Sequence, residues 1–179
     1  MTTGESGYER IEGDRYYTEP WVTHALLSRF KFAPAIWEPA AGMGHMSSVI
    51  AMHGYDVLST DIHPVEANNI FYGDFLQSEN CMTRDIITNP PYDYAEAFIN
   101  HALFLAEENY NRVAMLLRNE YDSASSREYL FDQHPAWDTK LVLTRRPRWV
   151  VDSGSPRHNY AWFIWDWNLP AGGRLIHGQ

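Results

Sequence analysis

The chain lacks several features that mark common protein classes. Cys81 is its single cysteine, so no disulfide can form within the chain and no cysteine pair is spaced for a structural zinc site. No apolar run reaches the ~18 residues that span a bilayer. The first ten residues, MTTGESGYER, contain no hydrophobic stretch typical of a secretory signal. We therefore expect a reduced thiol and a soluble, cytoplasmic protein.

Positive charge is also scarce. The formal net charge is -9, which disfavours binding to polyanions through bulk charge. Lys31 and Lys140 are the only lysines among 14 basic residues. Four of the arginines lie close together in the sequence, namely Arg145, Arg146, Arg148 and Arg157. Because arginine makes bidentate contacts to phosphate, this cluster predicts either a local anion-binding edge or a solvated surface turn.

The composition is otherwise that of a globular domain. Hydrophobic residues make up 45% and charged residues 21% of the 179 residues. A chain of this length is long enough for one core and too short for two ordinary domains. We expect a single domain over residues 1–179, in which residues 1–15 are flexible.

Helical and strand patterns alternate along the chain. Apolar residues at helical spacing predict helices, with Thr18 as the N-cap of the first and Asp93 with Glu96 as a capping arrangement at the third. The predicted helices cover residues 19–30, 45–53, 93–105 and 126–132, and the predicted strands cover 35–38, 56–60, 70–72, 85–88, 112–117, 140–144 and 160–165. Several strands are apolar throughout, which indicates a mostly parallel sheet covered on both faces. The predicted fold class is α/β, doubly wound.

Ligands of such sheets bind beyond the carboxyl ends of the strands. Glu38 ends the first predicted strand, and Gly42 and Gly44 in the following turn allow close backbone approach to a ligand. Asp61 follows the second strand, 17 residues after Gly44, where a carboxylate can accept hydrogen bonds from both hydroxyls of a ribose. A purely structural turn and a solvated aspartate remain open alternatives.

Two further strand ends combine polar and aromatic residues. Asp74 follows the third strand and could accept from an exocyclic adenine amine while Phe75 packs against the ring. Residues 89–92, with the sequence NPPY, follow the next strand, and their prolines stiffen the loop and remove backbone donors. The Asn89 amide oxygen and a backbone carbonyl could then accept both hydrogens of one NH2 group. Tyr92 would offer a flat face for the attached ring.

The motifs YYTEPW, EPAAGMG, Asp61, GDF and NPPY, in this order, resemble those of the S-adenosylmethionine-dependent amino-methyltransferases. The resemblance is greatest to the adenine-N6 DNA methyltransferases of bacteria and phages, and it runs from about Tyr16 to Trp165. It implies a Rossmann-like methyltransferase sheet with an antiparallel C-terminal strand. It also implies S-adenosylmethionine as cofactor and direct transfer of the methyl group to an amine.

The resemblance also implies roles for individual residues. Thr18 and the turn at residues 42–44 would hold the methionine end of the cofactor, Asp61 its ribose, and Asp74 with Phe75 its adenine. The full implied cofactor site is Tyr17, Thr18, Glu38, Ala40, Gly42, Gly44, Asp61, Ile62, Asp74, Phe75 and Asn89. The implied catalytic residues are Asn89, Pro90, Pro91 and Tyr92.

A nucleic-acid substrate follows from the same resemblance, with DNA favoured. The predicted substrate-binding residues are Arg145, Arg146, Arg148, Arg157 and His158. No separate target-recognition domain is expected, so a homodimer or a partner subunit could supply recognition. Methylation of RNA adenine or of a protein glutamine amide stays open, and so does a catalytically silent binding subunit with the same fold.

Overall fold

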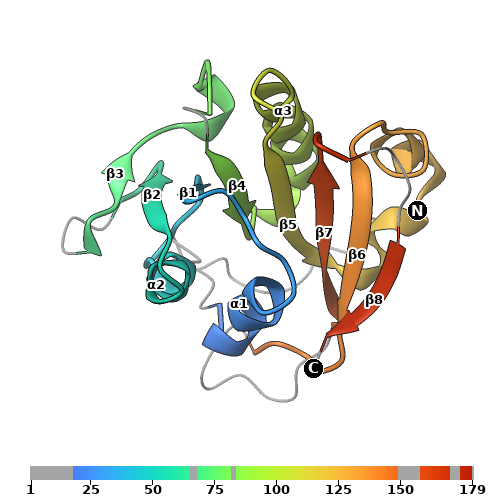
Figure 1. Cartoon of the computed structure of the whole chain (residues 1–179), viewed down its shortest axis with the longest axis horizontal. Coiled ribbons are helices and arrows are strands. Elements are labelled where there is room, and N and C mark those ends of the chain that lie inside the picture. The colour runs from blue at the N-terminus through green and yellow to red at the C-terminus, as the bar shows by residue number, and fades with distance from the viewer. Residues whose placement is uncertain (1–17, 65–67, 82–83, 149–157, 170–173, 179) are drawn as a thin grey trace, which may run out of the picture.

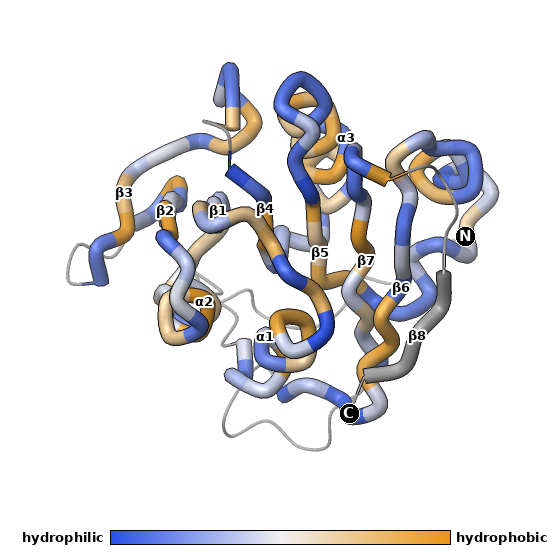
Figure 2. The backbone as a smooth tube through the Cα atoms, viewed as in Figure 1, coloured by the Kyte–Doolittle hydropathy of each residue, from blue (hydrophilic) through white to orange (hydrophobic). Residues whose placement is uncertain are grey.

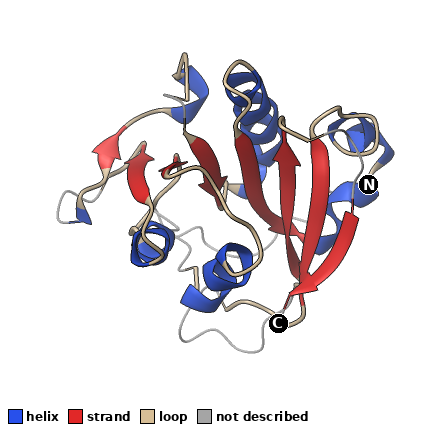
Figure 3. Ribbon diagram, in the orientation of Figure 1, coloured by secondary structure: helices blue, strands red, loops and turns tan. Residues whose placement is uncertain are grey.

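The computed structural model describes residues 18–64, 68–81, 84–148, 158–169 and 174–178. The helices are α1 (Pro20–Leu27), α2 (His45–Met52) and α3 (Ala95–Glu107), and the short 3₁₀ segments are η2 (Phe75–Gln77), η3 (Tyr92–Tyr94), η4 (Asn119–Ser123) and η5 (Ser125–Leu130). The strands are β1 (Ala35–Glu38), β2 (Asp56–Asp61), β3 (Phe71–Tyr72), β4 (Asp85–Thr88), β5 (Arg112–Arg118), β6 (Trp137–Leu143), β7 (Tyr160–Asp166) and β8 (Arg174–Gly178). Figure 3 shows how these helices and strands are distributed.

The strands form one sheet in the order β3-β2-β1-β4-β5-β7-β6-β8. The strands from β3 to β5 pair in parallel, and β7 lies between β5 and β6, antiparallel to both (Figure 1). This arrangement confirms the predicted α/β, doubly wound, mostly parallel sheet with an antiparallel strand near the C-terminus.

Alternate residues of each strand point to opposite faces, so the sheet contributes to two cores. Ile87 and Leu116 pack on the face covered by α1 and α2. Ile86 and Met115, their neighbours in sequence, pack on the face covered by α3. Figure 2 shows hydrophobic colour along most of β5, a strand that is buried on both sides. The predicted coverage of both faces is confirmed.

The strand directions bring several segments to one edge of the sheet. The parallel pairs of β1 with β2, β1 with β4, and β4 with β5 place their carboxyl ends side by side. Because β7 runs the opposite way, its first residue, Tyr160, lies opposite Arg118 at the end of β5. This edge is where the polar strand-end residues gather.

The ends of the first predicted helix differ from expectation. Glu19, not Thr18, is the N-cap of α1, and Pro20 occupies the first turn, where its missing N–H costs nothing. The helix ends at Leu27, short of the predicted residue 30. The backbone N–H of Phe30 still bonds to the carbonyl of Leu26 at 3.0 Å, so the last predicted residues form a closing turn.

The predicted capping arrangement at Asp93 and Glu96 is wrong. Helix α3 begins at Ala95, and its N-cap is Tyr94, without a side-chain hydrogen bond. The cause is the 3₁₀ turn after the prolines, in which the Tyr94 N–H bonds to the Pro91 carbonyl at 3.0 Å. Glu96 instead accepts a hydrogen bond from the hydroxyl of Tyr129 at 2.9 Å.

Two further features were misread or missed. The helix predicted over residues 126–132 is the 3₁₀ segment η5, which ends at Leu130. The sequence pattern also predicted that the strand ending near residue 165 is the last strand of the sheet. The structure has one more, β8, which pairs in parallel with β6 at the sheet edge. Two glycines precede this strand in the sequence and Gly178 ends it, while Leu175 and Ile176 are its only strongly apolar residues, which left too weak a pattern. Within the described ranges, no helix is both long and apolar enough to cross a membrane.

Candidate active site

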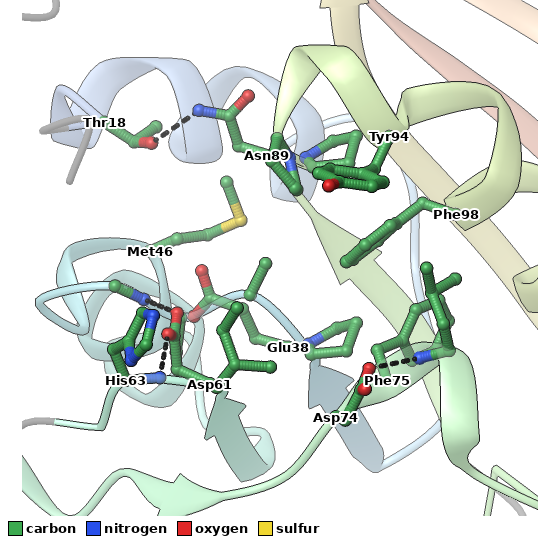
Figure 4. A pocket seen from close by; sticks show the side chains of 18 of the residues that line it. Thr18, Glu38, Met46, Asp61, His63, Asp74, Phe75, Asn89, Tyr94 and Phe98 are labelled. Atoms are coloured by element: carbon green, nitrogen blue, oxygen red, sulfur yellow. Dashed lines mark hydrogen bonds between the residues drawn. The ribbon is translucent and has the colours of Figure 1, made fainter. Parts of the chain in front are cut away.

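A cavity of about 490 Å³ opens beyond the carboxyl ends of β1, β2 and β4 (Figure 4). Eleven residues predicted from the sequence line it, namely Thr18, Glu38, Ala40, Gly42, Asp61, Ile62, Asp74, Phe75, Asn89, Pro90 and Pro91. The other lining residues are Pro39, Ala41, His45, Met46, His63, Leu76, Tyr94 and Phe98. Segments that are far apart in sequence thus form one wall.

Asp61 ties the two turns at one end of the cavity together. Its Oδ2 accepts from the backbone N–H of Gly42 at 2.8 Å, and its Oδ1 accepts from the N–H of His63 at 2.8 Å. Each carboxylate oxygen has two lone pairs, so each retains one for a further donor. Gly42 and Gly44 both have positive φ, 54° and 78°, which a residue with a side chain rarely adopts. Gly44 is the N-cap of α2 and does not line the cavity.

Glu38 is a buried carboxyl in the cavity wall, with 2% of its surface exposed. Its Oε2 accepts from the hydroxyl of Ser47, which also contacts the hydroxyl of Ser59 at 2.6 Å. Burial raises the pKa of Glu38 from 4.5 to about 8, and the nearby charge of Asp61 adds to this, whereas the Ser47 hydrogen bonds oppose it. In the unliganded protein Glu38 is therefore largely protonated at neutral pH.

Asp74 and Phe75 form the opposite end of the cavity. The Asp74 carboxylate caps the short segment η2 by accepting from the backbone N–H of Leu76 at 3.1 Å. Phe75 is 1% exposed, and its ring packs against those of Trp37 and Phe98, with centroid separations of 5.2 and 4.8 Å. Phe75 therefore belongs mainly to the core and presents only part of its ring to the cavity.

Asn89 stands where β4 ends, and its two amide atoms have different surroundings. The Nδ2 group lies 3.5 Å from the hydroxyl oxygen of Thr18, which is itself buried. The Oδ1 atom is buried and has no hydrogen-bond partner within the described residues. Figure 4 shows the amide of Asn89 turned toward Thr18 on one side. The hydroxyl predicted to cap α1 thus contacts the predicted catalytic amide.

The two tyrosines after the prolines lie in different places. Tyr92 does not line the cavity, and its hydroxyl bonds to that of Tyr160 at 2.9 Å. The guanidinium of Arg118 lies 5.6 Å from the centre of the Tyr92 ring. Tyr94 does line the cavity and is 59% exposed, with Phe98 one helical turn further on.

The predicted substrate-binding arginines lie outside the cavity. Arg145 stacks on the ring of Trp21, with 4.7 Å from guanidinium carbon to ring centre. Arg146 donates from Nε to the side chain of Asn159 at 2.9 Å, and the backbone N–H of Arg148 donates to Glu19 at 2.8 Å. His158 is exposed just before β7. Tyr17 and Arg157 fall outside the described residues, and so does most of the segment that joins β6 to β7.

Several residues that line the cavity were not predicted from the sequence, because only the folded chain brings them next to the predicted ones. Met46 and His45 are in the first turn of α2, directly after the glycine turn, and Figure 4 shows the Met46 sulfur directed between Asn89 and Asp61. An aromatic pair at helical spacing directly after NPPY would have pointed to Tyr94 and Phe98. Among the described residues, no group of three or more His, Cys, Asp or Glu side chains could hold a metal ion.

No protein-family model matches the chain, and neither does any curated protein sequence. Its fold is similar to those of several solved structures. The methyltransferase subunit of a type I restriction-modification system from Streptococcus thermophilus matches with a TM-score of 0.59 and 13% identity, over 91% of this chain and 47% of that one. The 23S rRNA methyltransferase ErmE matches with a TM-score of 0.60 and 15% identity, over 84% and 68% of the two chains.

A dimethyladenosine transferase from Plasmodium falciparum is also similar, with a TM-score of 0.58 and 13% identity over 83% of this chain and 61% of that one. The chain spans about half the length of the type I subunit. At these identities the likeness concerns the fold, and the strand order with its antiparallel β7 agrees with it. The chain therefore has the class I fold of S-adenosylmethionine-dependent methyltransferases.

Proposed function

We propose that the chain is an S-adenosylmethionine-dependent N-methyltransferase that acts on the exocyclic N6 amine of adenine in nucleic acid, with DNA favoured. The observation that carries the proposal is the Asn89 Oδ1 atom, which is buried without a hydrogen-bond partner in the described residues. Leaving a buried acceptor unpaired costs about 1–3 kcal/mol. A substrate amine would supply the missing donor.

Three features of the cavity fit the cofactor. Its volume of about 490 Å³ is within the range of small-molecule sites, roughly 300–1,000 Å³. Asp61 keeps one lone pair on each oxygen, as two ribose hydroxyls require. Glu38 is a buried carboxyl whose side-chain contact is a hydroxyl, so it can ionise beside a cationic group. Thr18 and the turn at residues 42–44 would hold the methionine end, and Asp74 with Phe75 would lie beside the adenine.

The Asn89 loop supplies the chemistry on the substrate side. When bound, S-adenosylmethionine supplies an electrophilic methyl group on its sulfonium. An aromatic amine is a poor nucleophile because its lone pair is delocalised into the ring. Hydrogen bonds from its two N–H groups to Asn89 Oδ1 and to the Pro90 carbonyl favour a pyramidal nitrogen that faces the methyl group. In that arrangement the nitrogen would accept the methyl group, sulfur would keep the electron pair of the broken carbon–sulfur bond, and the nitrogen would then lose one proton to water.

A covalent intermediate is not part of this proposal. Cys81 is buried and contacts the Leu105 carbonyl and the Asn111 side chain at 3.2 Å, on the α3 side of the sheet. Catalysis would instead come from positioning and from electrostatic stabilisation of the charge that builds on nitrogen. A base within a duplex would have to flip out to reach Asn89, at a cost of a few kcal/mol.

The nucleic acid would approach on the side of Tyr92. The target base would stack on the Tyr92 ring, with Pro91 beside it. The residues proposed to hold its phosphates are Arg145, Arg146, Arg148, Arg157 and His158.

The proposal is tested by offering methyl-labelled cofactor together with duplex DNA, single-stranded DNA, RNA or a protein extract. The product is hydrolysed and the labelled nucleoside or residue is identified by mass. N6-methyladenine from DNA is the expected product, and the Asn89→Ala variant is the matched negative control. Label in RNA adenine or in glutamine would assign that substrate in place of DNA adenine. No label in any sample would indicate a silent binding subunit.

A further inference from the structure

Two segments meet at Asn89, and each carries an aromatic ring three residues further on. The loop after β4 carries Tyr92, three residues past Asn89. The start of α1 carries Trp21, three residues past Thr18, whose hydroxyl oxygen lies 3.5 Å from Asn89 Nδ2. Both rings are half-buried, so each is fixed in place and still offers surface to solvent.

An arginine lies over each of these rings. The guanidinium carbon of Arg118 is 5.6 Å from the centre of Tyr92, and that of Arg145 is 4.7 Å from the centre of Trp21. Both arginines are exposed. We call Trp21, Tyr92, Arg118 and Arg145 the rim.

The two halves of the rim belong to one continuous edge. The Tyr92 hydroxyl contacts that of Tyr160 at 2.9 Å, and Tyr160 lies opposite Arg118 in the pairing of β7 with β5. The neighbouring Asn159 accepts from the Asn119 N–H at 2.9 Å and from Arg146, which is next to Arg145 in sequence. Contacts therefore lead from the Tyr92 ring to the Trp21 ring along this edge.

The rim arginines differ from two other arginines, which form ion pairs. Arg84 pairs with Asp56 at 2.9 Å, and Arg112, which lies over an aromatic ring at the opposite end of β5, pairs with Asp166. Within the part of the chain that the structure describes, neither Arg118 nor Arg145 lies within 4 Å of a carboxylate oxygen. A guanidinium that rests on a ring keeps its edge donors available for phosphate.

We infer that the rim binds single-stranded nucleic acid, with bases stacked on Tyr92 and Trp21 and the adjoining phosphates on Arg118 and Arg145. Alternating aromatic and cationic groups are the chemistry that binds single strands with little sequence preference. This inference rests on the proposed function and narrows its substrate class. A glutamine side chain in a protein would bring neither bases nor phosphates to the rim.

The test measures binding of a fluorescein-labelled single-stranded DNA 12-mer that contains adenine, by anisotropy over a series of salt concentrations. Arg118→Gln and Arg145→Gln should each make the slope of log affinity against log salt shallower by about 0.7, and the double variant by about 1.4. Arg29→Gln is the matched control, because Arg29 is exposed just after the end of α1, away from the rim. An RNA 12-mer of the same sequence distinguishes the two kinds of strand.

The ring contribution is measured separately. Tyr92→Ala should weaken strand binding by about 5- to 150-fold, the range for loss of one stacked base. Affinity for S-adenosylmethionine, measured by calorimetry, should stay unchanged in both arginine variants, which shows that the site itself is intact. Because both arginine side chains are exposed, the variants are expected to fold, and thermal melting verifies this.

The outcomes separate this inference from the proposed function. An unchanged salt slope in the double variant would overturn the rim as a binding surface. Methylation of protein glutamine without strand binding would also overturn the rim, while methyl transfer at Asn89 would stand. Strand binding with the expected slopes but no methyl transfer to any substrate would leave the rim in place and refute the proposed activity.

Discussion

The carboxylate of Asp61 accepts a hydrogen bond from the backbone N–H of Gly42 at 2.8 Å. The end of β2 therefore holds the turn that follows β1, and the residue proposed to bind the ribose also shapes the wall around it. Asp61→Ala should weaken S-adenosylmethionine binding by about 1.5–3 kcal/mol for each charge-assisted bond lost. Isothermal titration calorimetry measures this loss.

Asp56→Asn is the matched control for that experiment. Asp56 begins the same strand, but its carboxylate pairs with Arg84 at the surface, at 2.9 Å. Its removal should leave cofactor affinity unchanged. If a folded Asp61→Ala protein bound the cofactor as tightly as the parent, the ribose assignment would be wrong.

Asn89→Ala should spare cofactor binding and remove most turnover. The amide is proposed to act on the reacting amine, so its loss should lower kcat by roughly 100-fold or more. Single-turnover methyl transfer measures the turnover, and calorimetry measures the affinity for the cofactor. Asn100→Ala is the control, since Asn100 is exposed on α3 and bonds to Tyr129. Equal losses of affinity and turnover would indicate that Asn89 serves cofactor binding instead.

Glu38 should make the unliganded protein less stable as the pH rises. Its pKa is 4.5 in the reference state and about 8 in the fold, so between these values the unfolded chain releases a proton that the folded protein keeps. The stabilising contribution is complete below about 4.5 and is lost as the pH rises through about 8. Urea unfolding of the parent and of Glu38→Gln across this window isolates the effect. Parallel pH profiles for the two proteins would contradict the raised pKa.

The Tyr92 ring and its hydroxyl should have separable roles. Tyr92→Phe keeps the stacking surface and loses the hydrogen bond to Tyr160, so activity should persist while stability falls by about 0.5–1.5 kcal/mol. Tyr92→Ala should lose activity. Steady-state kinetics on an adenine-containing strand, with thermal melting of each variant, gives both quantities. Full activity of Tyr92→Ala would mean that the base does not stack there.

Much of the sheet was predictable because its strands carry strong local patterns. The apolar run through β5 and the glycine turn before α2 identify a strand and a helix start from neighbouring residues alone. Asp61 and Asn89 could be predicted to lie in one cavity wall because each stands at the carboxyl end of a strand, and parallel strands bring these ends together. The α/β class and most of the cavity wall followed from such signals.

Other features depend on contacts between distant segments, which a local pattern does not record. The Thr18 hydroxyl fits an N-cap by local pattern, yet it contacts Asn89, 71 residues away. The position of Tyr92 likewise depends on its hydrogen bond to Tyr160, 68 residues further on. A contact between residues so far apart in the sequence leaves no recognisable pattern in a single sequence.

The reversed direction of β7 has a consequence for engineering. The chain leaves the sheet after β6 and re-enters at Tyr160 on the same side as Asn89, so both ends of this connection, at Thr144 and Asn159, adjoin the rim. A recognition module inserted between Arg148 and His158 would be tethered beside the substrate, would keep Arg145 in the rim, and would interrupt no strand of the described residues. The same graft between α3 and β5 would be tethered at the opposite edge, where β5 begins. The connection between β6 and β7 is therefore the place at which sequence selectivity could be added to this scaffold.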